Sequence, residues 1–480
     1  MYRRIAGAIR ESIETGSLPV GARLPAIRAL AQQLEVNRDT VALAYETLAA
    51  EGHVESTVGR GTFVRAHRAR PARPSGPPAI TAEVERLLVI ENSRTRFGVG
   101  ADVVELHSLI PDPELYPVDD FRRAFNRAVA RSGSELFLYG EAQGHAGLRD
   151  TLAKRFDASG IDVGPGEIVL CHGASQGIAL ALRLFASPGE RVAVEVPTYH
   201  NVLAALASLG LEPAPVPMTD AGPDLAALER VLAEPDVKAF YTIPTFHNPM
   251  GISTSLLHRR ALLDVARRAG CPVIEDAFES DLRTSGAPVA SLAALDHDGF
   301  VVHLQSFSKS LFPGLRVGSI VARGRMVDGL VALKHATDLS DAQLLQAALS
   351  EFIEEGAYDR HLGRIRRELR LRHVAVHEAL GASMPEGTRW TRPEGGYQVW
   401  VELPFAVDTR DLLADASRAG MLYSPGAHFL PDGGASRSLR LTLARASSDQ
   451  IHRGIAALGR VVAERLSSRS AARSAPGVLL

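Results

Sequence analysis

One lysine of this chain stands in a segment suited to covalent chemistry. The 53 cationic residues are nearly all arginine, and the four lysines are Lys154, Lys238, Lys309 and Lys334. Lys309 lies in the small, polar run Ser306-Phe307-Ser308-Lys309-Ser310. Unlike arginine, a lysine can lose its proton and attack a carbonyl carbon. A surface loop that happens to hold a lysine is the alternative, and the other motifs must decide.

Small or polar residues follow five apolar runs that are typical of buried strands. These runs cover residues 168–170, 192–196, 239–243, 273–274 and 301–304. Their alternation with helical stretches predicts an α/β fold with a mostly parallel sheet wrapped by helices. Ligands bind at the carboxyl ends of the strands in such sheets. The residues that follow the strands should therefore converge on one site.

The groups that follow these runs fit one cofactor. They are a glycine-rich turn at 173–177 leading into a helix expected over 178–185, the ring of Tyr199, the amide of Asn248, the carboxylate of Asp276 and the amine of Lys309. A phosphate site at a helix N-terminus, an aromatic plate, a carboxylate and a Schiff-base lysine are what pyridoxal phosphate requires. Each group alone is more often structural, but five in this order are hard to explain by packing. A cis bond is expected before Pro249.

The first 65 residues predict a separate small domain. Apolar spacing indicates a helix over 2–15, a second helix opened by Pro25 and a third after 35–37. Two short helices joined so tightly make a helix-turn-helix, and residues 37–40 would face a DNA groove. Residues 53–56 and 62–64 predict two strands around a basic, glycine-rich tip, which is a wing.

Composition sets the limits on domains and location. At 480 residues two or three domains are expected, and 46% hydrophobic with 22% charged residues is typical of a soluble protein. No apolar run suggests a membrane span or a targeting signal, so a cytoplasmic location is expected. Two cysteines, Cys171 and Cys271, are too few for a disulfide framework or a metal cluster. Ten arginines against seven acidic residues in 1–70 weakly indicate a polyanionic partner.

A proline-rich stretch divides the chain. Residues 66–80 hold four prolines and one glycine, which predicts an extended linker. We therefore expect a DNA-binding head over 1–65, a linker over 66–99, a cofactor-binding body over 100–466 and a flexible tail over 467–480.

The head resembles the winged-helix domain of the GntR family of bacterial regulators. The similar segments are 24–31, 37–41, 48–52 and 59–64. The resemblance implies that DNA is contacted by the second helix, the third helix and the wing, through Arg28, Asn37, Arg38, Thr40, Gly59, Arg60 and Gly61. Asp39 departs from the family, where a neutral hydroxyl residue is common, and would need a donor such as cytosine. A head used only for oligomerisation is the alternative.

Residues 100 to 465 resemble the class I aminotransferases, of fold type I among the pyridoxal-phosphate enzymes, with a smaller C-terminal α/β subdomain. The resemblance implies an internal aldimine at Lys309, a protonated ring nitrogen at Asp276, stacking by Tyr199 and a bond from Asn248 to the 3-oxygen. It also implies a set of residues around the phosphate, namely Ser175, Gln176, Ser306, Ser308 and Arg316.

Three further residues carry implications of the same resemblance. Tyr139 matches a tyrosine that reaches the phosphate of the partner subunit, which implies a homodimer. Arg440 matches the arginine that pairs with a substrate carboxylate, a task suited to its forked donors. Phe278 stands where related regulators often have a tyrosine that donates to the 3-oxygen. Asn248 would then make that contact alone, so any transaminase activity is expected to be weak or limited to a half-reaction.

Head, linker and body in this order resemble the MocR subfamily of GntR regulators. The resemblance implies a DNA-binding transcriptional regulator that senses an amino compound, or the vitamer itself, through bound pyridoxal phosphate. The first alternative is a working aminotransferase with a vestigial head, favoured by Asn248-Pro249 and by the motif at 394–402. The second is a cofactor-free dimer that only presents DNA-binding heads.

Overall fold

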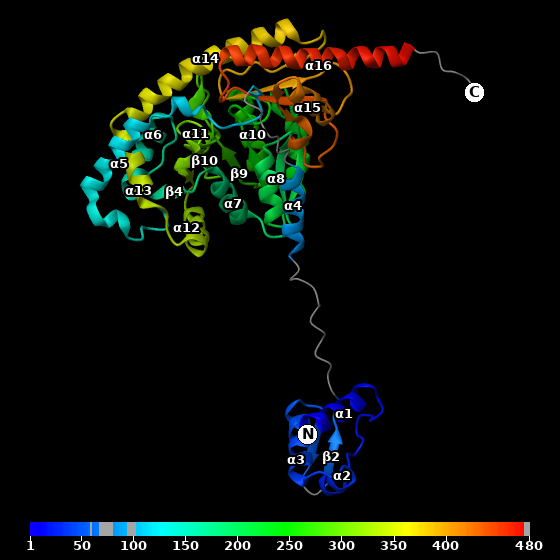
Figure 1. The fold of residues 1–480 in the computed structure, drawn as a ribbon. Helices are drawn as coiled ribbons and strands as arrows, with labels where there is room; N and C mark the ends of the chain where they lie inside the picture. Colours follow the sequence, from blue (N-terminus) through cyan, green and yellow to red (C-terminus); the bar gives the residue numbers. More distant parts are fainter. Residues whose placement is uncertain (58–59, 67–79, 94–101, 475–480) are drawn as a thin grey trace. The chain divides into compact units, whose positions relative to one another are not determined.

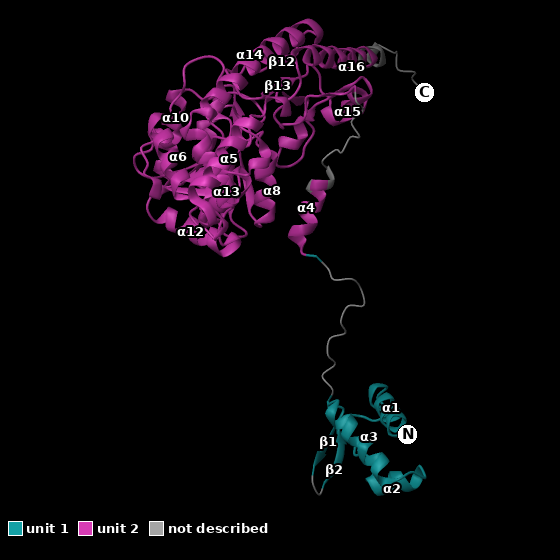
Figure 2. Cartoon of the chain, turned by 60° about the vertical axis from the view of Figure 1, so that its left-hand side comes forward, with its two compact units in different colours: residues 1–80 teal, residues 81–480 magenta. Residues whose placement is uncertain are grey.

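The chain forms two compact units, residues 1–80 and 81–480 (Figure 2). The computed structural model describes residues 1–57, 60–66, 80–93 and 102–474. Each unit has its own apolar core, so each is treated by itself.

The first unit is a winged helix-turn-helix. Its elements are α1 Tyr2–Glu14, α2 Ile27–Gln33, α3 Arg38–Ala50, β1 Val54–Thr57 and β2 Gly61–Val64, with the two strands antiparallel. Ile5, Val41 and Leu48 are buried between the helices. Asn37 caps α3 by accepting a hydrogen bond from the Asp39 backbone N–H at 3.1 Å. The predicted helices and strands are confirmed.

The second unit is built on an eight-stranded mixed sheet of order β4-β11-β10-β9-β8-β5-β6-β7. The strands are β4 Ile168–Cys171, β5 Arg191–Val196, β6 Glu212–Thr219, β7 Gly222–Pro223, β8 Val237–Thr242, β9 Val273–Asp276, β10 Val301–Ser306 and β11 Gly318–Val321. Strands β5, β6, β8, β9 and β10 run parallel. Strand β11 is antiparallel to both of its neighbours. The five predicted strands are confirmed as β4, β5, β8, β9 and β10.

Helices cover both faces of this sheet (Figure 1). One apolar core involves α7 Ala174–Phe185, α8 His200–Ser208 and α12 Arg325–Asp338. The larger core involves α6 Ala146–Ala158, α9 Leu225–Leu232, α10 Leu256–Ala269, α13 Gln343–Glu354 and α14 Ala357–Ser383. Helix α5 Val118–Ser132 packs against α13. With both faces covered, the central strands are largely buried.

A smaller C-terminal layer completes the body. It has the antiparallel strands β12 Arg389–Trp390, β13 Gln398–Glu402, β16 Ser438–Thr442 and β15 Ser424–Pro425, with the helices α15 Thr409–Arg418 and α16 Ser448–Ser474. Strand β14 Met421–Leu422 pairs in parallel with β3 Val104–Glu105. Helices α14 and α16 lie side by side (Figure 1).

Two predicted segments differ from the structure. Residues 82–93 of the predicted 66–99 linker form helix α4 Ala82–Ser93, which packs against α8. The prolines end at Pro78, and Glu83 and Glu85 in the first turn favour a helix. Likewise α16 continues to Ser474, because residues 467–474 hold neither glycine nor proline. Residues 67–79, 94–99 and 475–480 of these two predictions lie outside the described residues.

Within the described ranges, no helix is both long enough and apolar enough to cross a membrane.

Candidate functional site

Lys309 follows strand β10 and is held against the backbone of residue 109. Its ammonium donates to the Leu109 carbonyl oxygen at 2.7 Å. Burial lowers the pKa of Lys309 to about 8, the nearby Glu279 carboxylate opposes this, and Arg440 and Arg316 add to it. A lysine with this pKa is partly neutral near pH 7 to 8, so it can act as a nucleophile.

Asp276 ends strand β9 and is fully buried. It accepts hydrogen bonds from the Tyr241 hydroxyl at 2.7 Å and from the Phe278 backbone N–H at 3.2 Å. Burial raises the pKa of Asp276 to about 6, while these two donors act to lower it. Tyr241 was not predicted as a site residue, because it lies inside an apolar strand.

Asn248 and Arg440 are hydrogen-bonded to each other near Lys309. Arg440 on β16 donates to Asn248 Oδ1 at 3.0 Å, to the His107 carbonyl oxygen at 2.9 Å and to Ser424 Oγ at 3.0 Å. Because Lys309 bonds the carbonyl of residue 109, both cations hold the same segment, 107–109. Burial lowers the pKa of Arg440 to about 10, so its side chain stays charged. The Asn248–Pro249 bond is cis, as expected.

The predicted phosphate residues gather at the start of α7. Ser175 and Gln176 open this helix after Gly173, whose φ is +78°. Arg316 donates to the His172 carbonyl oxygen at 2.7 Å, and a Cβ at Gly173 would lie 3.2 Å from its guanidinium. The Gln176 side chain instead bonds Asp338 and the His172 backbone N–H. The backbone N–H of Gln176, in the first turn of α7, remains suited to a phosphate.

The other two predicted phosphate residues are Ser306, which ends strand β10, and Ser308, which follows it. The Ser308 backbone N–H donates to Ser306 Oγ at 3.2 Å. Several buried polar atoms of the body have no hydrogen-bond partner among the described residues, and Asn248 Nδ2, Ser308 Oγ and Arg440 Nε are among them. Buried polar atoms are normally paired. These three belong to the residues expected at the 3-oxygen of pyridoxal phosphate, at its phosphate and at a ligand carboxylate, so the site fits that cofactor.

The rings of Tyr199 and Phe278 lie parallel, with centroids 6.4 Å apart and an interplanar angle of 6°. Tyr199 also accepts a hydrogen bond from the Asn201 side-chain amide at 2.6 Å. Phe278 offers no hydroxyl to the site, as its sequence position implied. Tyr139 is 84% exposed, and its expected contact with a partner subunit stays a prediction.

Glu279 is a second buried carboxylate that sequence analysis missed. It accepts hydrogen bonds from the Tyr397 backbone N–H at 3.0 Å and from Gln398 Nε2 at 3.1 Å. The Tyr397 hydroxyl donates to the Lys309 carbonyl oxygen at 3.2 Å. Burial raises the pKa of Glu279 to about 7, and the Lys309 charge is among the effects that oppose this.

The glycines of the 394–402 motif make this arrangement possible. A Cβ at Gly396 would lie 2.8 Å from Glu279 Oε2, and one at Gly395 would lie 2.4 Å from the Leu282 carbonyl oxygen. The double glycine was therefore the sequence signal for a buried partner of this segment.

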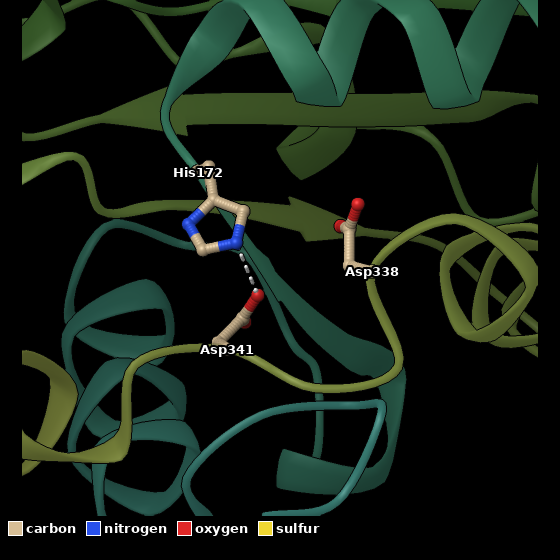
Figure 3. A group of neighbouring side chains, drawn as sticks. All are labelled: His172, Asp338 and Asp341. Carbon is tan, nitrogen blue, oxygen red and sulfur yellow. Dashed lines mark ion pairs between the residues drawn. The ribbon is translucent and has the colours of Figure 1, made fainter.

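A cluster next to the phosphate residues offers three possible metal ligands, His172, Asp338 and Asp341 (Figure 3). His172 Nε2 lies 3.2 Å from Asp341 Oδ1. The buried Lys334 ammonium lies 2.7 Å from the same oxygen. Because Lys334 already supplies the cation, we interpret the cluster as an ion-pair network that fixes the loop before α7.

A cavity of ≈ 530 Å³ adjoins the cofactor residues. Arg440 and His107 line it, whereas Lys309 is not among its lining residues. Much of the rest is apolar, including Leu203 of α8, Phe429 and Val89 of α4. The cavity borders segment 107–109 at His107, and both Arg440 and Lys309 bind this segment.

The predicted DNA-contacting residues lie on the first unit. Arg28, Asn37, Arg38 and Arg60 are exposed, while Thr40 and Gly61 are half-buried. Gly59 lies outside the described residues. Three of these side chains lie at the N-terminus of α3, whose helix dipole also favours a phosphate: Asn37, Arg38 and Thr40.

Comparisons with known proteins agree with both units. Residues 102–458 match the family described as aminotransferase class I and II, and residues 1–64 match bacterial regulatory proteins of the gntR family. An uncharacterized HTH-type transcriptional regulator of Bacillus subtilis, YdfD, is 30% identical over 98% of this chain and 97% of its own length. The probable rhizopine catabolism regulatory protein MocR of Rhizobium meliloti is 28% identical over 88% and 86%.

Solved structures resemble the body. The multiple substrate aminotransferase from Thermococcus profundus has a TM-score of 0.74 and 30% identity over 81% of this chain and 96% of its own. A kynurenine aminotransferase from Pyrococcus horikoshii has the same TM-score and 32% identity, over the same shares. Its structure was solved with PMP.

Proposed function

The chain belongs to the aminotransferase class I and II family and, with its GntR-type DNA-binding head, to the MocR-like regulators, and on this premise we propose a transcriptional regulator that senses an amino compound. Its cofactor is pyridoxal phosphate. The observation that carries the proposal is the union of an exposed recognition helix with a body that keeps Lys309, Asp276 and Arg440 in a cofactor-type arrangement.

The proposal assigns each side chain a task toward the cofactor. When bound, pyridoxal phosphate supplies an electrophilic carbon and an electron-accepting ring. Lys309 would hold it covalently, Asp276 would pair with the ring nitrogen, Tyr199 would lie on the ring and Asn248 Nδ2 would donate to the 3-oxygen. The phosphate would be held by the start of α7 and by nearby side chains, namely Ser175, the Gln176 backbone, Ser306, Ser308 and Arg316.

Arg440 would recognise the effector. Its guanidinium is buried, charged and fixed by three hydrogen bonds, while its Nε lacks a partner in the described structure. A carboxylate that joins this cluster would meet a preorganised cation. The effector is therefore an amine that also carries a carboxylate.

We propose that the regulator acts as a homodimer, with Tyr139 reaching the phosphate site of the other subunit. Its high exposure in a single chain supports this role. Effector binding regulates DNA only if it favours one arrangement of the two heads over another, since equal affinity for both would shift nothing.

Footprinting tests the regulator directly. The full-length protein with its cofactor should protect a defined operator upstream of a neighbouring gene. Absence of any protected sequence across these upstream regions would contradict the proposal.

Catalysis is the second candidate, because the chain has Lys309, Asp276, Asn248 and Arg440, the residues that transamination would use. Against it, Phe278 cannot donate to the 3-oxygen. Turnover of an amino acid with 2-oxoglutarate at about 1 per second or more would establish an enzyme. A single half-reaction without turnover would favour the sensor.

A further inference from the structure

Helix α4 connects two parts of the molecule that regulation must link. In sequence it follows the proline-rich stretch behind the DNA-binding head, and in space it packs against α8 of the body (Figure 1). Its residue Val89 lines the cavity that Arg440 also lines. The first helix after the linker is thus a wall of the candidate effector pocket.

Helix α4 is weakly held by the protein itself. None of its residues whose side chains are described is fully buried, and Val84 and Leu88 are exposed beside Val89, which is 71% exposed. A helix of twelve residues is marginal in water without tertiary packing. Its position should therefore depend strongly on whatever packs against Val89.

The cavity offers a ligand both polar and apolar lining residues. Arg440 and His107 are among its polar lining residues, and His107 belongs to the segment 107–109 that Lys309 also binds. Leu203, Phe429 and Val89 are apolar lining residues, and the Arg440 guanidinium lies over the Phe429 ring, 4.9 Å from its centroid. Of the cationic residues at the cavity, Arg410 is already paired with Asp408. A second anionic group is thus not favoured in the ligand, whereas an apolar body is.

We propose that an α-amino acid with an apolar side chain packs that side chain against Val89 and so orders α4, which couples occupancy of the pocket to the chain that leads to the DNA-binding head. This inference rests on the proposed function. The amine then lies toward Lys309, the carboxylate on Arg440 and the apolar body between α4 and α8. The contact between the ligand side chain and Val89 stabilises the ordered position of α4. The state with α4 ordered therefore binds the ligand more tightly than the state with α4 disordered.

The test uses the full-length protein with its cofactor and two probes, L-phenylalanine and L-alanine. Each is titrated by the visible absorption of the lysine-bound cofactor. Val89→Asp places a charge at the apolar wall, and Val84→Asp is the matched control on the same helix, outside the residues that line the cavity. We expect Val89→Asp to weaken L-phenylalanine about tenfold and L-alanine less than about twofold. Val84→Asp should change neither.

Amide hydrogen exchange of residues 82–93 gives an independent measurement. Saturating L-phenylalanine should slow exchange in α4 of the wild-type protein about tenfold, and L-alanine should not. Val89→Ala, which adds no charge, should reduce the slowing of α4 exchange by L-phenylalanine to about half or less.

Several results would overturn the inference. Equal losses in the two Asp variants, or α4 exchange that L-phenylalanine leaves unchanged, would show that Val89 is no ligand contact. If exchange in α4 slowed when only the protein concentration was raised, the apolar residues of α4 would instead contact a second copy of the chain. Failure of the proposed function is distinguishable, because it would remove the cofactor band of the untreated protein or the operator footprint.

Discussion

Tyr241 donates its hydroxyl hydrogen to Asp276 Oδ2 over 2.7 Å, with both residues buried in the central sheet. The pair joins two neighbouring parallel strands, since Tyr241 on β8 stands opposite Ile274 on β9. The bond stabilises a carboxylate that burial would otherwise protonate near neutral pH. A residue expected only to fill the core thus supports the charge that the cofactor ring needs.

Tyr241→Phe should weaken cofactor retention at the acidic side of neutrality. Asp276 is charged above its pKa of about 6, so the partner of the ring nitrogen is lost as pH falls through that value. Without the donor the pKa rises further, and the loss should begin about one pH unit higher. Visible absorption from pH 5 to 8 measures it. Tyr45→Phe in the head should leave the profile unchanged, and coincident curves for Tyr241→Phe would refute the role of the bond.

Lys309→Ala should abolish the visible band of the bound cofactor. No other side chain at the site can form the Schiff base, and Lys309→Arg should fail as well because arginine stays protonated. Lys154→Ala is the matched control and should keep the band. A band that persists in Lys309→Ala would disprove the assignment.

Glu279→Gln should lower the pH at which the lysine-bound cofactor loses its proton. The Glu279 carboxylate raises the pKa of Lys309, so its removal destabilises the protonated nitrogen. We expect a shift of about one pH unit downward, read from the absorption spectrum. Glutamine can still accept from the Tyr397 backbone N–H, which limits structural damage. Glu402→Gln, at the surface end of β13, should give no shift; an upward shift for Glu279→Gln would contradict the electrostatic argument.

Arg440→Ala should reduce the affinity for amino acids but not for amines that lack a carboxylate. Loss of a buried, charge-assisted pair costs about 1.5 to 3 kcal/mol, or roughly 10 to 100-fold in affinity. Titrations with L-phenylalanine and with 2-phenylethylamine, which differ only in the carboxylate, separate this effect from general damage. Equal weakening of both compounds would argue against carboxylate recognition.

Arg38→Ala should weaken operator binding and reduce its dependence on salt. Arg38 is exposed at the N-terminus of α3, where it can neutralise a phosphate. The slope of log affinity against log salt concentration should fall by about one. Arg10→Ala is the control, because Arg10 is paired with Glu51 at 2.6 Å within the head. An unchanged slope would place Arg38 outside the interface.

The sequence predicted those parts of the fold and site that depend on local pattern. The positions of Asp276, Asn248 and Lys309 at or after strand ends predicted them as site residues, because the carboxyl ends of parallel strands meet at one edge of the sheet. Tyr241 and Glu279 escaped prediction for a different reason. Their roles depend on which strands are neighbours and on a close approach of residues 394–398, and neither is visible in local periodicity.

The two wrong boundaries have a similar cause. Composition marked 66–99 as one linker, yet only the part up to Pro78 holds prolines, and α4 forms once they end. Residues 467–480 were predicted as a flexible tail, although α16 continues to Ser474 and the Ser467 hydroxyl donates to the Ala463 carbonyl oxygen of this helix at 3.0 Å. Amphiphilic surface helices and true linkers share polar composition, so packing decides between them.

The double glycine at 395–396 also constrains how the body can move. At this position two hydrogen bonds join the C-terminal layer to the segment after Asp276. The Gly396 N–H donates to the Leu282 carbonyl oxygen, and the Tyr397 N–H donates to Glu279. No side chain can separate the two backbones there. Any displacement of the C-terminal layer relative to the segment after Asp276 must therefore either preserve or break these two hydrogen bonds.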